Sequence, residues 1–266
     1  MSKKRNYNVI VGSILTGVLL LMIVIGIFFL PYDPETMNIE LKFAGISFSH
    51  PFGCDNYGRD IFTRVMVGAR TTLLVALGTV GIGAGTGVLI GAFTGYFGGW
   101  IDEVMMRIID ALFAFPSILL ALVVISLLGS GKYQVIVALG IAFIPSFARV
   151  VRSEYLKQRE MDYVKNARIM GCGNLRIMFV HILPNILPVL IPTVMIGFNN
   201  AVLAEAGMSY LGIGVQPPDA SLGRMLSEAQ TYLFTQPSYA LCTGMIIVLL
   251  VLGFSLLADG LQTLER

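Results

Sequence analysis

The sequence predicts an all-α integral membrane protein. Its 266 residues are 56% hydrophobic and only 13% charged, and the mean hydropathy is +0.79. A soluble globule of this size would need more polar residues to cover its surface. Charge-free apolar runs of the length that a bilayer requires recur along the whole chain. The formal net charge of +2 is small and the basic residues are dispersed, so nothing in the charge balance suggests nucleic-acid binding.

Six runs without Asp, Glu, Lys or Arg predict six transmembrane helices. The first run follows three basic residues but is too long for a signal peptide and lacks a cleavage pattern, so we interpret it as a retained anchor. The fourth run is short, and we expect it to extend through Arg149 and Arg152 by snorkelling. The runs are residues 8–30, 71–101, 111–131, 133–148, 177–204 and 229–258.

The distribution of Lys and Arg predicts the orientation. With the N-terminus inside, twelve of the 18 basic residues fall on the inner side and six on the outer side. Both termini are therefore expected in the cytoplasm. This topology divides the chain into a cytoplasmic tail with the first anchor (1–30), an extracellular loop (31–67), a transmembrane core (68–259) and a cytoplasmic tail (260–266).

Two patterns predict how the core packs. Four glycines at four-residue spacing lie on one face of the second run and allow close approach of another backbone, either from a helix of this chain or from a second subunit. Pro116 and Pro145 predict bends in the third and fourth spans, either as packed kinks or as hinges. Before the core, Asp60 and Arg64 have the spacing of a helical ion pair. The glycines are Gly83, Gly87, Gly91 and Gly95.

The longest expected cytoplasmic segment, 153–184, lies in the most basic part of the chain. From 149 to 176 there are seven basic and three acidic residues. Apolar residues at helical spacing predict two short amphipathic helices, separated at Gly171-Cys172-Gly173. A helix on the lipid surface would have a similar pattern. The apolar face here is thin and contains Ala and Gly, which favours docking against a protein.

This segment resembles the coupling signature of binding-protein-dependent ABC importer permeases. In that signature Glu-Ala-Ala is followed three residues later by Gly, and then by Ile-x-Leu-Pro. Here Lys165-Asn166-Ala167, Gly171 and His181-Ile182-Leu183-Pro184 have the same spacing, although Lys165 and Asn166 replace the first two residues. Segments 31–34, 52–64, 68–70, 209–218 and 257–260 are similar to the C-type subunit of dipeptide, oligopeptide and nickel importers, with Cys54 at a place usually held by Thr.

The resemblance implies a type I ABC importer permease fold in a bacterial cell membrane. It also implies a second permease subunit, two cytoplasmic ATPase subunits and an extracellular solute-binding protein, besides the lipid bilayer. The sequence contains no Walker A pattern, so ATP hydrolysis is expected in a separate subunit, with no catalytic residue or cofactor in this chain. The ATPase-coupling residues that the resemblance implies are Asp162, Tyr163, Val164, Ala167, Arg168, Gly171, His181 and Pro184.

Candidates for the translocation pathway are few. Asn199 and Asn200 lie inside an apolar run, where an unpaired amide is costly, so they either bond a neighbouring helix or face a water-filled pathway. Ser117 and Glu205 are the other polar candidates. Such a sparse set is consistent with selectivity residing mainly in the binding protein.

Other functions remain as alternatives. A self-powered carrier would be expected to have coupling carboxylates at mid-membrane, whereas the acids here lie towards the ends of the runs. An intramembrane enzyme would need a motif such as GxSxG or HExxH, and the sequence has neither. A nickel importer would share the architecture, but His50 and His181 are expected on opposite sides of the membrane and predict no metal site. Overall resemblance favours a peptide as cargo.

Overall fold

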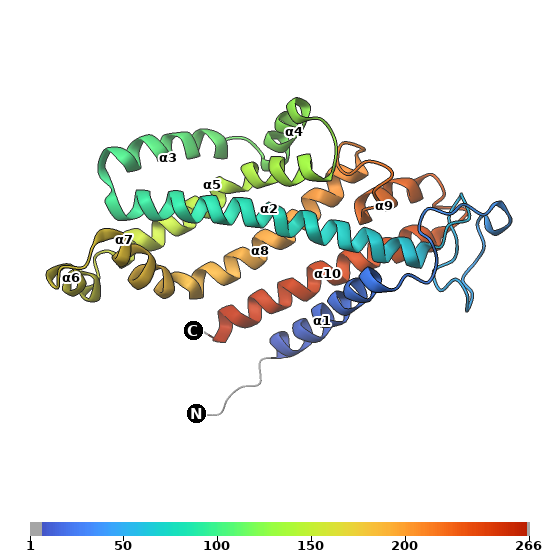
Figure 1. The fold of residues 1–266 in the computed structure, drawn as a ribbon, viewed down its shortest axis with the longest axis horizontal. Helices are drawn as coiled ribbons and strands as arrows, with labels where there is room; N and C mark the ends of the chain where they lie inside the picture. The colour runs from blue at the N-terminus through green and yellow to red at the C-terminus, as the bar shows by residue number, and fades with distance from the viewer. Residues whose placement is uncertain (1–6, 265–266) are drawn as a thin grey trace.

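The computed structural model describes residues 7–264, which form an elongated bundle of helices (Figure 1). In this part of the chain every regular element is helical, which confirms the all-α class. The elements are α1 Tyr7–Phe28, the 3-10 turn η1 Ile39–Leu41, α2 Ile61–Phe97, α3 Gly99–Phe113, α4 Ser117–Leu128, α5 Lys132–Gln158, α6 Asp162–Ile169, α7 Asn174–Arg176, the π-helical turn η2 Ile177–Ile182, α8 Leu183–Tyr210, α9 Leu222–Gln230 and α10 Pro237–Leu264.

Five of the described helices are long and apolar enough to cross a membrane, where six spans were expected. A sixth is obtained only if α3 and α4 are taken as one span, and they are bent by 91° at the break between them. The bend predicted at Pro116 in the third span is therefore present, as a sharp break between two helices. α4 begins directly after Pro116, which has no backbone N–H to continue the preceding helix. At Pro145, by contrast, α5 continues without a break.

The glycine stripe packs α2 against α5. A Cβ on Gly87 would lie 2.6 Å from the Phe147 Cβ, and one on Gly95 would lie 2.6 Å from the Tyr155 Cβ. The two helices are thus close enough that only glycine fits along the seam. The partner of the stripe is a helix of this same chain, which decides between the two alternatives left open by the spacing.

α3 is attached to the bundle in a different way. The chain turns back after α2 through Gly98 and Gly99, both at positive φ, so the expected second span ends at Phe97 and not at Ile101. Only Ile109 is buried on α3. α5 extends through Arg149 and Arg152, as expected, and both arginines pair with acids of α3: Arg152 contacts Asp102 at 2.5 and 2.6 Å, and Arg149 contacts Asp110 at 2.7 Å.

At one end of the bundle α6 forms the tip, followed by a turn at Gly171 with φ of +80°. The break at Gly171–Gly173 is confirmed. The second short amphipathic helix is not a separate element, because residues 174–210 run on from α7 through η2 into α8 as one span. α1 begins and α10 ends toward this same side of the molecule (Figure 1).

The opposite end is formed by segment 29–60 and α9 (Figure 1). Asp60 is the N-cap of α2: its carboxylate accepts a hydrogen bond from the Thr63 N–H at 2.7 Å and contacts His50 Nδ1 at 2.9 Å. The expected Asp60–Arg64 ion pair is therefore absent, because capping occupies the acid. Arg64 contacts Glu228 instead, at 3.1 Å. Capping also starts α2 at Ile61, inside the segment expected to be a loop.

Candidate functional site

The helix α6 presents one face to the bundle and another to its surroundings. Val164 and Ala167 point inward and are buried, whereas Ile169 and Met170 are 83% and 84% exposed. The acid Asp162 in the first turn and the base Arg168 in the last turn complement the helix dipole. The helix is therefore fixed on its inner face and uncovered on its outer face.

The inner face of α6 rests on a small apolar cluster separate from the main core. Val164 and Ala167 pack there with residues of α2, α5 and the 174–210 helix. The phenol of Tyr155 on α5 donates a hydrogen bond to the Met178 carbonyl in η2 at 3.0 Å, inside this cluster. The cluster consists of Ala92, Tyr96, Val151, Tyr155, Val164, Ala167, Ile177, Met178, Ile182 and Ile186.

The remaining coupling candidates surround α6. Tyr163 donates a hydrogen bond from its phenol to Gln158 Oε1 at 2.9 Å, and partial burial raises the pKa of that phenol, so it stays neutral. Arg168 lies over the Tyr96 ring, 5.8 Å from its centroid. Gly171 forms the turn. His181 and Pro184 lie further along, where the helix enters the bundle, and therefore stand apart from the exposed tip.

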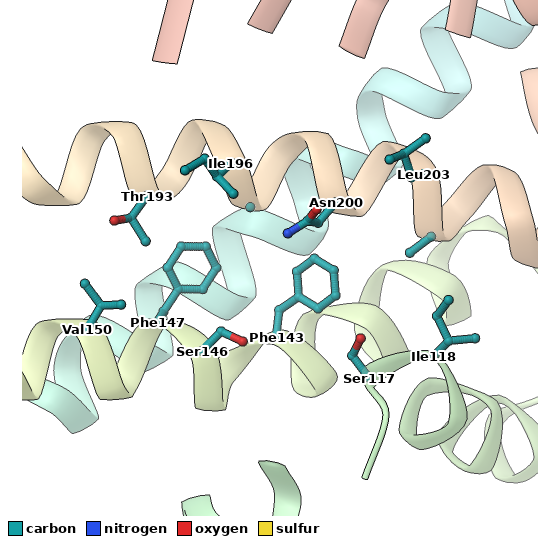
Figure 2. A pocket seen from close by; sticks show the side chains of 12 residues that line it. Ser117, Ile118, Phe143, Ser146, Phe147, Val150, Thr193, Ile196, Asn200 and Leu203 are labelled. Atoms are coloured by element: carbon teal, nitrogen blue, oxygen red, sulfur yellow. The ribbon is translucent and has the colours of Figure 1, made fainter. Parts of the chain in front are cut away.

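A hollow of about 390 Å³ opens between α4, α5 and α8 (Figure 2). Phe143 and Phe147 project from α5 towards α8, and a Cβ on Gly197 would lie 2.5 Å from the Phe147 ring. The polar groups are three hydroxyls and one amide, and none of the residues lining this hollow is charged. They are Ser117, Ile118, Phe143, Ser146, Phe147, Val150, Thr193, Ile196, Gly197, Asn200, Leu203 and Ala204.

The structure brings together two of the four pathway candidates. Ser117 and Asn200 line this hollow, on α4 and α8. Asn199 points elsewhere and is buried, and its Oδ1 accepts no hydrogen bond from residues 7–264. Glu205 lies outside the hollow. Sequence reasoning missed Ser146 and Thr193 in the hollow and the exposed Ile169 and Met170 at the tip. For Thr193 the available signal was the spacing of three to four residues between lining positions of α8, from 193 to 204.

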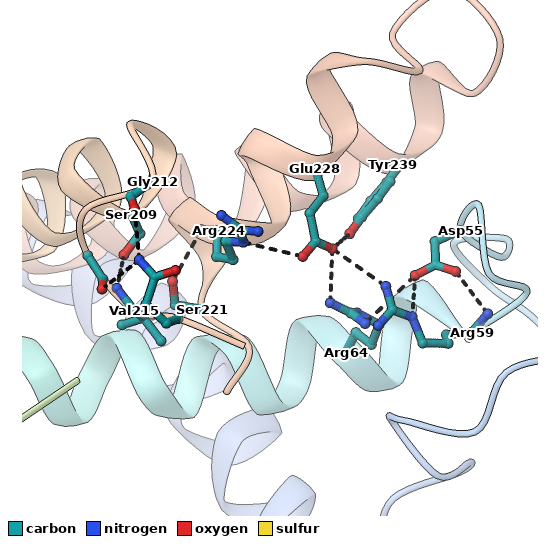
Figure 3. A network of polar contacts seen from close by, with 12 residues as sticks. Asp55, Arg59, Arg64, Ser209, Gly212, Val215, Ser221, Arg224, Glu228 and Tyr239 are labelled. Carbon is teal, nitrogen blue, oxygen red and sulfur yellow. Dashed lines mark hydrogen bonds and ion pairs between the residues drawn. The ribbon is translucent and has the colours of Figure 1, made fainter. Parts of the chain in front are cut away.

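Glu205 is fully buried and fastens a loop to the bundle. Its carboxylate accepts hydrogen bonds from the Thr72 hydroxyl at 2.8 Å and the Ser209 hydroxyl at 2.6 Å. Ser209 also accepts one from the Val215 N–H, and Thr72 accepts one from the Leu222 N–H. Figure 3 shows Ser209 and Val215 beside the start of α9. The acid thus holds the 211–221 loop against α2.

The described residues contain no group of three or more His, Cys, Asp or Glu that could hold a metal ion. Cys54, Cys172 and Cys242 are unpaired. Cys54 is buried, and burial near Asp60 and Asp55 raises the pKa of its thiol to about 11. The candidate site has two parts, the exposed α6 tip and the uncharged hollow, and α5 and α8 connect them.

The chain is similar in sequence to transport system permease proteins. The chain is 39% identical over 236 residues to the glutathione transport system permease protein GsiD of Pectobacterium atrosepticum, covering 88% of this chain and 78% of that protein. It is 38% identical over 259 residues to the dipeptide transport system permease protein DppC of Alkalihalophilus pseudofirmus, covering 97% and 85%.

A solved structure shares the fold. It is an inward-facing form of the MetNI methionine ABC transporter, with a TM-score of 0.62 and 19% identity over 76% of this chain and 96% of the other. The helical bundle is therefore that of an ABC importer permease. Residues 87–264 match the family described as binding-protein-dependent transport system inner membrane component. This chain belongs to that family, and is a multi-pass membrane permease of an ABC importer.

Proposed function

We propose that this chain is one permease subunit of a peptide importer, that α6 is the docking element for a cytoplasmic ATPase, and that the hollow between α4, α5 and α8 belongs to the translocation pathway. The observation that carries the proposal is the two-faced placement of α6. Its inner face is packed on the bundle, while Ile169 and Met170 are uncovered at the tip.

The same helices connect the two features. α5 and the 174–210 helix hold the inner face of α6 through the apolar cluster, and they also line the hollow. A rigid displacement of α6 on closure of the ATPase pair is therefore transmitted along α5 and α8 to the hollow walls. In this scheme α6 works as a lever, and the energy comes from a partner that hydrolyses ATP.

The sidedness follows from the same scheme. An ATPase partner requires α6 in the cytoplasm, which agrees with the excess of basic residues expected inside. The start of α1 and the end of α10, which lie toward the α6 side, would then also be cytoplasmic. Segment 29–60 and α9 would face outward, where a solute-binding protein delivers its cargo.

A peptide is the cargo that the hollow suits best. Hydroxyls of Ser117, Ser146 and Thr193 and the amide of Asn200 can exchange hydrogen bonds with a peptide backbone of any sequence. The lining of the hollow offers no imidazole, thiolate or carboxylate for nickel. The relatives named above are permeases for glutathione and for dipeptides, which supports the same cargo class.

Gly171 provides the test. Its φ of +80° is strained for any residue with a Cβ, although nothing lies within 4 Å of the Cβ position. In Gly171→Val, we expect a cost of about 1–2 kcal/mol to displace the turn after α6 and to abolish substrate-stimulated ATP hydrolysis in the reconstituted transporter. The protein should still insert in the membrane.

Gly173→Val is the matched control. Gly173 has an ordinary φ of −66° and equally open space, so its variant should keep normal coupling. In parallel, Ile169→Cys should crosslink to the ATPase, whereas Leu127→Cys, 82% exposed on α4, should not. Normal stimulation in Gly171→Val, or crosslinks from position 169 to lipid alone, would disprove the docking role.

A further inference from the structure

We propose that the end of the bundle opposite α6 carries a binding site for a carboxylate group, of the kind that ends every unmodified peptide. The inference rests on the proposed function in one respect only, that the cargo arrives from the side of the membrane on which this end lies. The site is an arginine cluster, which comprises Asp55, Arg59, Arg64, Arg224 and Glu228 (Figure 3).

The cluster joins two parts of the chain that are far apart in sequence. Arg59 and Arg64 come from the start of α2 and the segment before it, and Arg224 and Glu228 come from α9. Glu228 is central: its carboxylate lies 3.1 Å from Arg64 Nη2, 3.5 Å from Arg59 Nη2 and 3.4 Å from Arg224 Nε. The Tyr239 phenol donates a further hydrogen bond to it at 3.1 Å.

The second acid is shared as well. Asp55 receives Arg59 Nε at 2.7 Å and lies 3.8 Å from Arg64 Nη1. Three guanidinium groups are thus neutralised by two carboxylates, which leaves one positive charge in excess. The side chains are shielded from water: Arg64 is 6% exposed and Arg59 is 12% exposed. An uncompensated charge in such a place is costly and favours a third anion.

Guanidinium nitrogens without a hydrogen-bond acceptor also favour a bound anion. Arg59 Nη2, Arg64 Nε and Arg224 Nε are buried and have no hydrogen-bond acceptor among the described residues. Two of these nitrogens are within ion-pair distance of Glu228 but lack the geometry of a hydrogen bond. Because a guanidinium cannot lose its proton, these N–H groups remain donors without a hydrogen-bond acceptor in the described part of the chain.

The cluster is accessible to such an acceptor. Arg59, Arg64 and Glu228 line a hollow of about 370 Å³ beside Pro217 and Pro218. Arg59, Arg224 and Glu228 line a second hollow of about 350 Å³, which shares Met37 and Pro217 with the first. Hollows of this size accommodate a small molecule.

The charge balance selects the class of ligand. Guanidinium forks bind carboxylates in bidentate fashion. A polyanion would exceed the single positive charge in excess. On the wall of the larger hollow Asp219 is neutralised by Lys132 at 2.8 Å, but Glu35 offsets the excess charge there. Glu228 is the only acid among the residues lining the smaller hollow, so the carboxylate is expected in the smaller hollow. The site therefore suits one carboxylate on an otherwise uncharged or zwitterionic molecule.

The test uses the assembled transporter in nanodiscs without ATP. Glycylglycine binding is titrated by saturation-transfer NMR and compared with glycylglycine amide, which lacks only the carboxylate. We expect the amide to bind at least about tenfold more weakly, the loss equivalent to one charge-assisted hydrogen bond. Acetate should compete with glycylglycine, because a free carboxylate is sufficient.

Two variants locate the site. Arg224→Gln removes the most exposed guanidinium of the cluster and should weaken glycylglycine about tenfold. Arg70→Gln, an exposed arginine on α2 outside the cluster, should leave binding unchanged. Equal binding of acid and amide, failure of acetate to compete, or an unaffected Arg224→Gln would overturn the inference. Dipeptide uptake that persists without carboxylate binding refutes this site alone, whereas binding without ATP-driven uptake refutes the proposed function.

Discussion

The contact between α2 and α5 and the contact between α3 and α5 differ in what fills the space. Along α2 and α5 the backbones nearly touch, with glycine after glycine at the seam. Between α3 and α5 the contact is made by the ends of long side chains, in two Arg–Asp pairs and in the stacking of Arg149 over Phe113 at 3.9 Å. A close-packed seam moves as one body, whereas side-chain pairs can be broken and remade.

Within the proposed scheme, the different packing of the two contacts gives α2 with α5 and α3 different mechanical roles. The α2–α5 pair, which carries α6, acts as the rigid part. The arm formed by α3, which the 91° break separates from α4 and on which only Ile109 is buried, is the part free to change position or to meet a second subunit. Substitutions in the two contacts should therefore differ in size and in kind.

The largest effect is expected at the seam. In Gly91→Leu the new Cβ would meet the Ala148 carbonyl at 2.6 Å and the Arg152 N–H at 2.8 Å, both backbone groups that cannot move aside. We expect a loss of about 3 kcal/mol or more and little folded protein in detergent, measured by thermal unfolding. Gly85→Leu on the same helix has open space and should fold normally. Equal stability of the two variants would disprove the rigid seam.

A smaller effect is expected at the arm. Asp102→Asn removes the charge that Arg152 contacts with two nitrogens, and both side chains are less than a third exposed. We expect about 2 kcal/mol of destabilisation, and recovery when the charges are exchanged in Asp102→Arg with Arg152→Asp. Glu103→Gln, which affects the exposed pair with Arg107, is the control and should cause no measurable change. If the exchange fails to restore stability, the pair does not hold the arm.

The smallest effect is expected where the seam meets η2. Tyr155→Phe keeps the ring in the α6 cluster but removes the hydrogen bond to the Met178 carbonyl, which should cost about 1 kcal/mol. Amide hydrogen exchange should increase locally in residues 177–182. Tyr133→Phe, at an exposed tyrosine, should change neither quantity. Faster exchange throughout α8 would mean that the bond supports the whole helix and not the junction alone.

Much of the bundle could be predicted from composition and spacing. Charge-free runs located five spans, because the bilayer requires apolar length whatever the neighbours are. The Gly-Cys-Gly break after α6 was also local, since glycine alone tolerates the positive φ of that turn. The second amphipathic helix of the same segment was misplaced, because the same apolar spacing is compatible with a separate helix and with the first turns of a long span.

The candidate site was only partly predictable. Asn200 and Asn199 are adjacent in sequence, yet only Asn200 lines the hollow, because neighbouring residues on a helix point in different directions. Val164 and Ala167 were expected in the coupling segment, but their inward packing and the exposure of Ile169 could not be read from spacing without knowing where the bundle lies.

The sequence by itself determined the membrane class, the places where the chain crosses the bilayer and the family signature, because these depend on local apolar length and residue spacing. Only the tertiary structure decided which helix receives the glycine stripe, how sharply the third span breaks at Pro116 and which partner Arg64 takes. These are choices among contacts distant in sequence, and they are made by the geometry of packing: Asp60 caps α2, and Glu228 comes from α9 to meet the arginine.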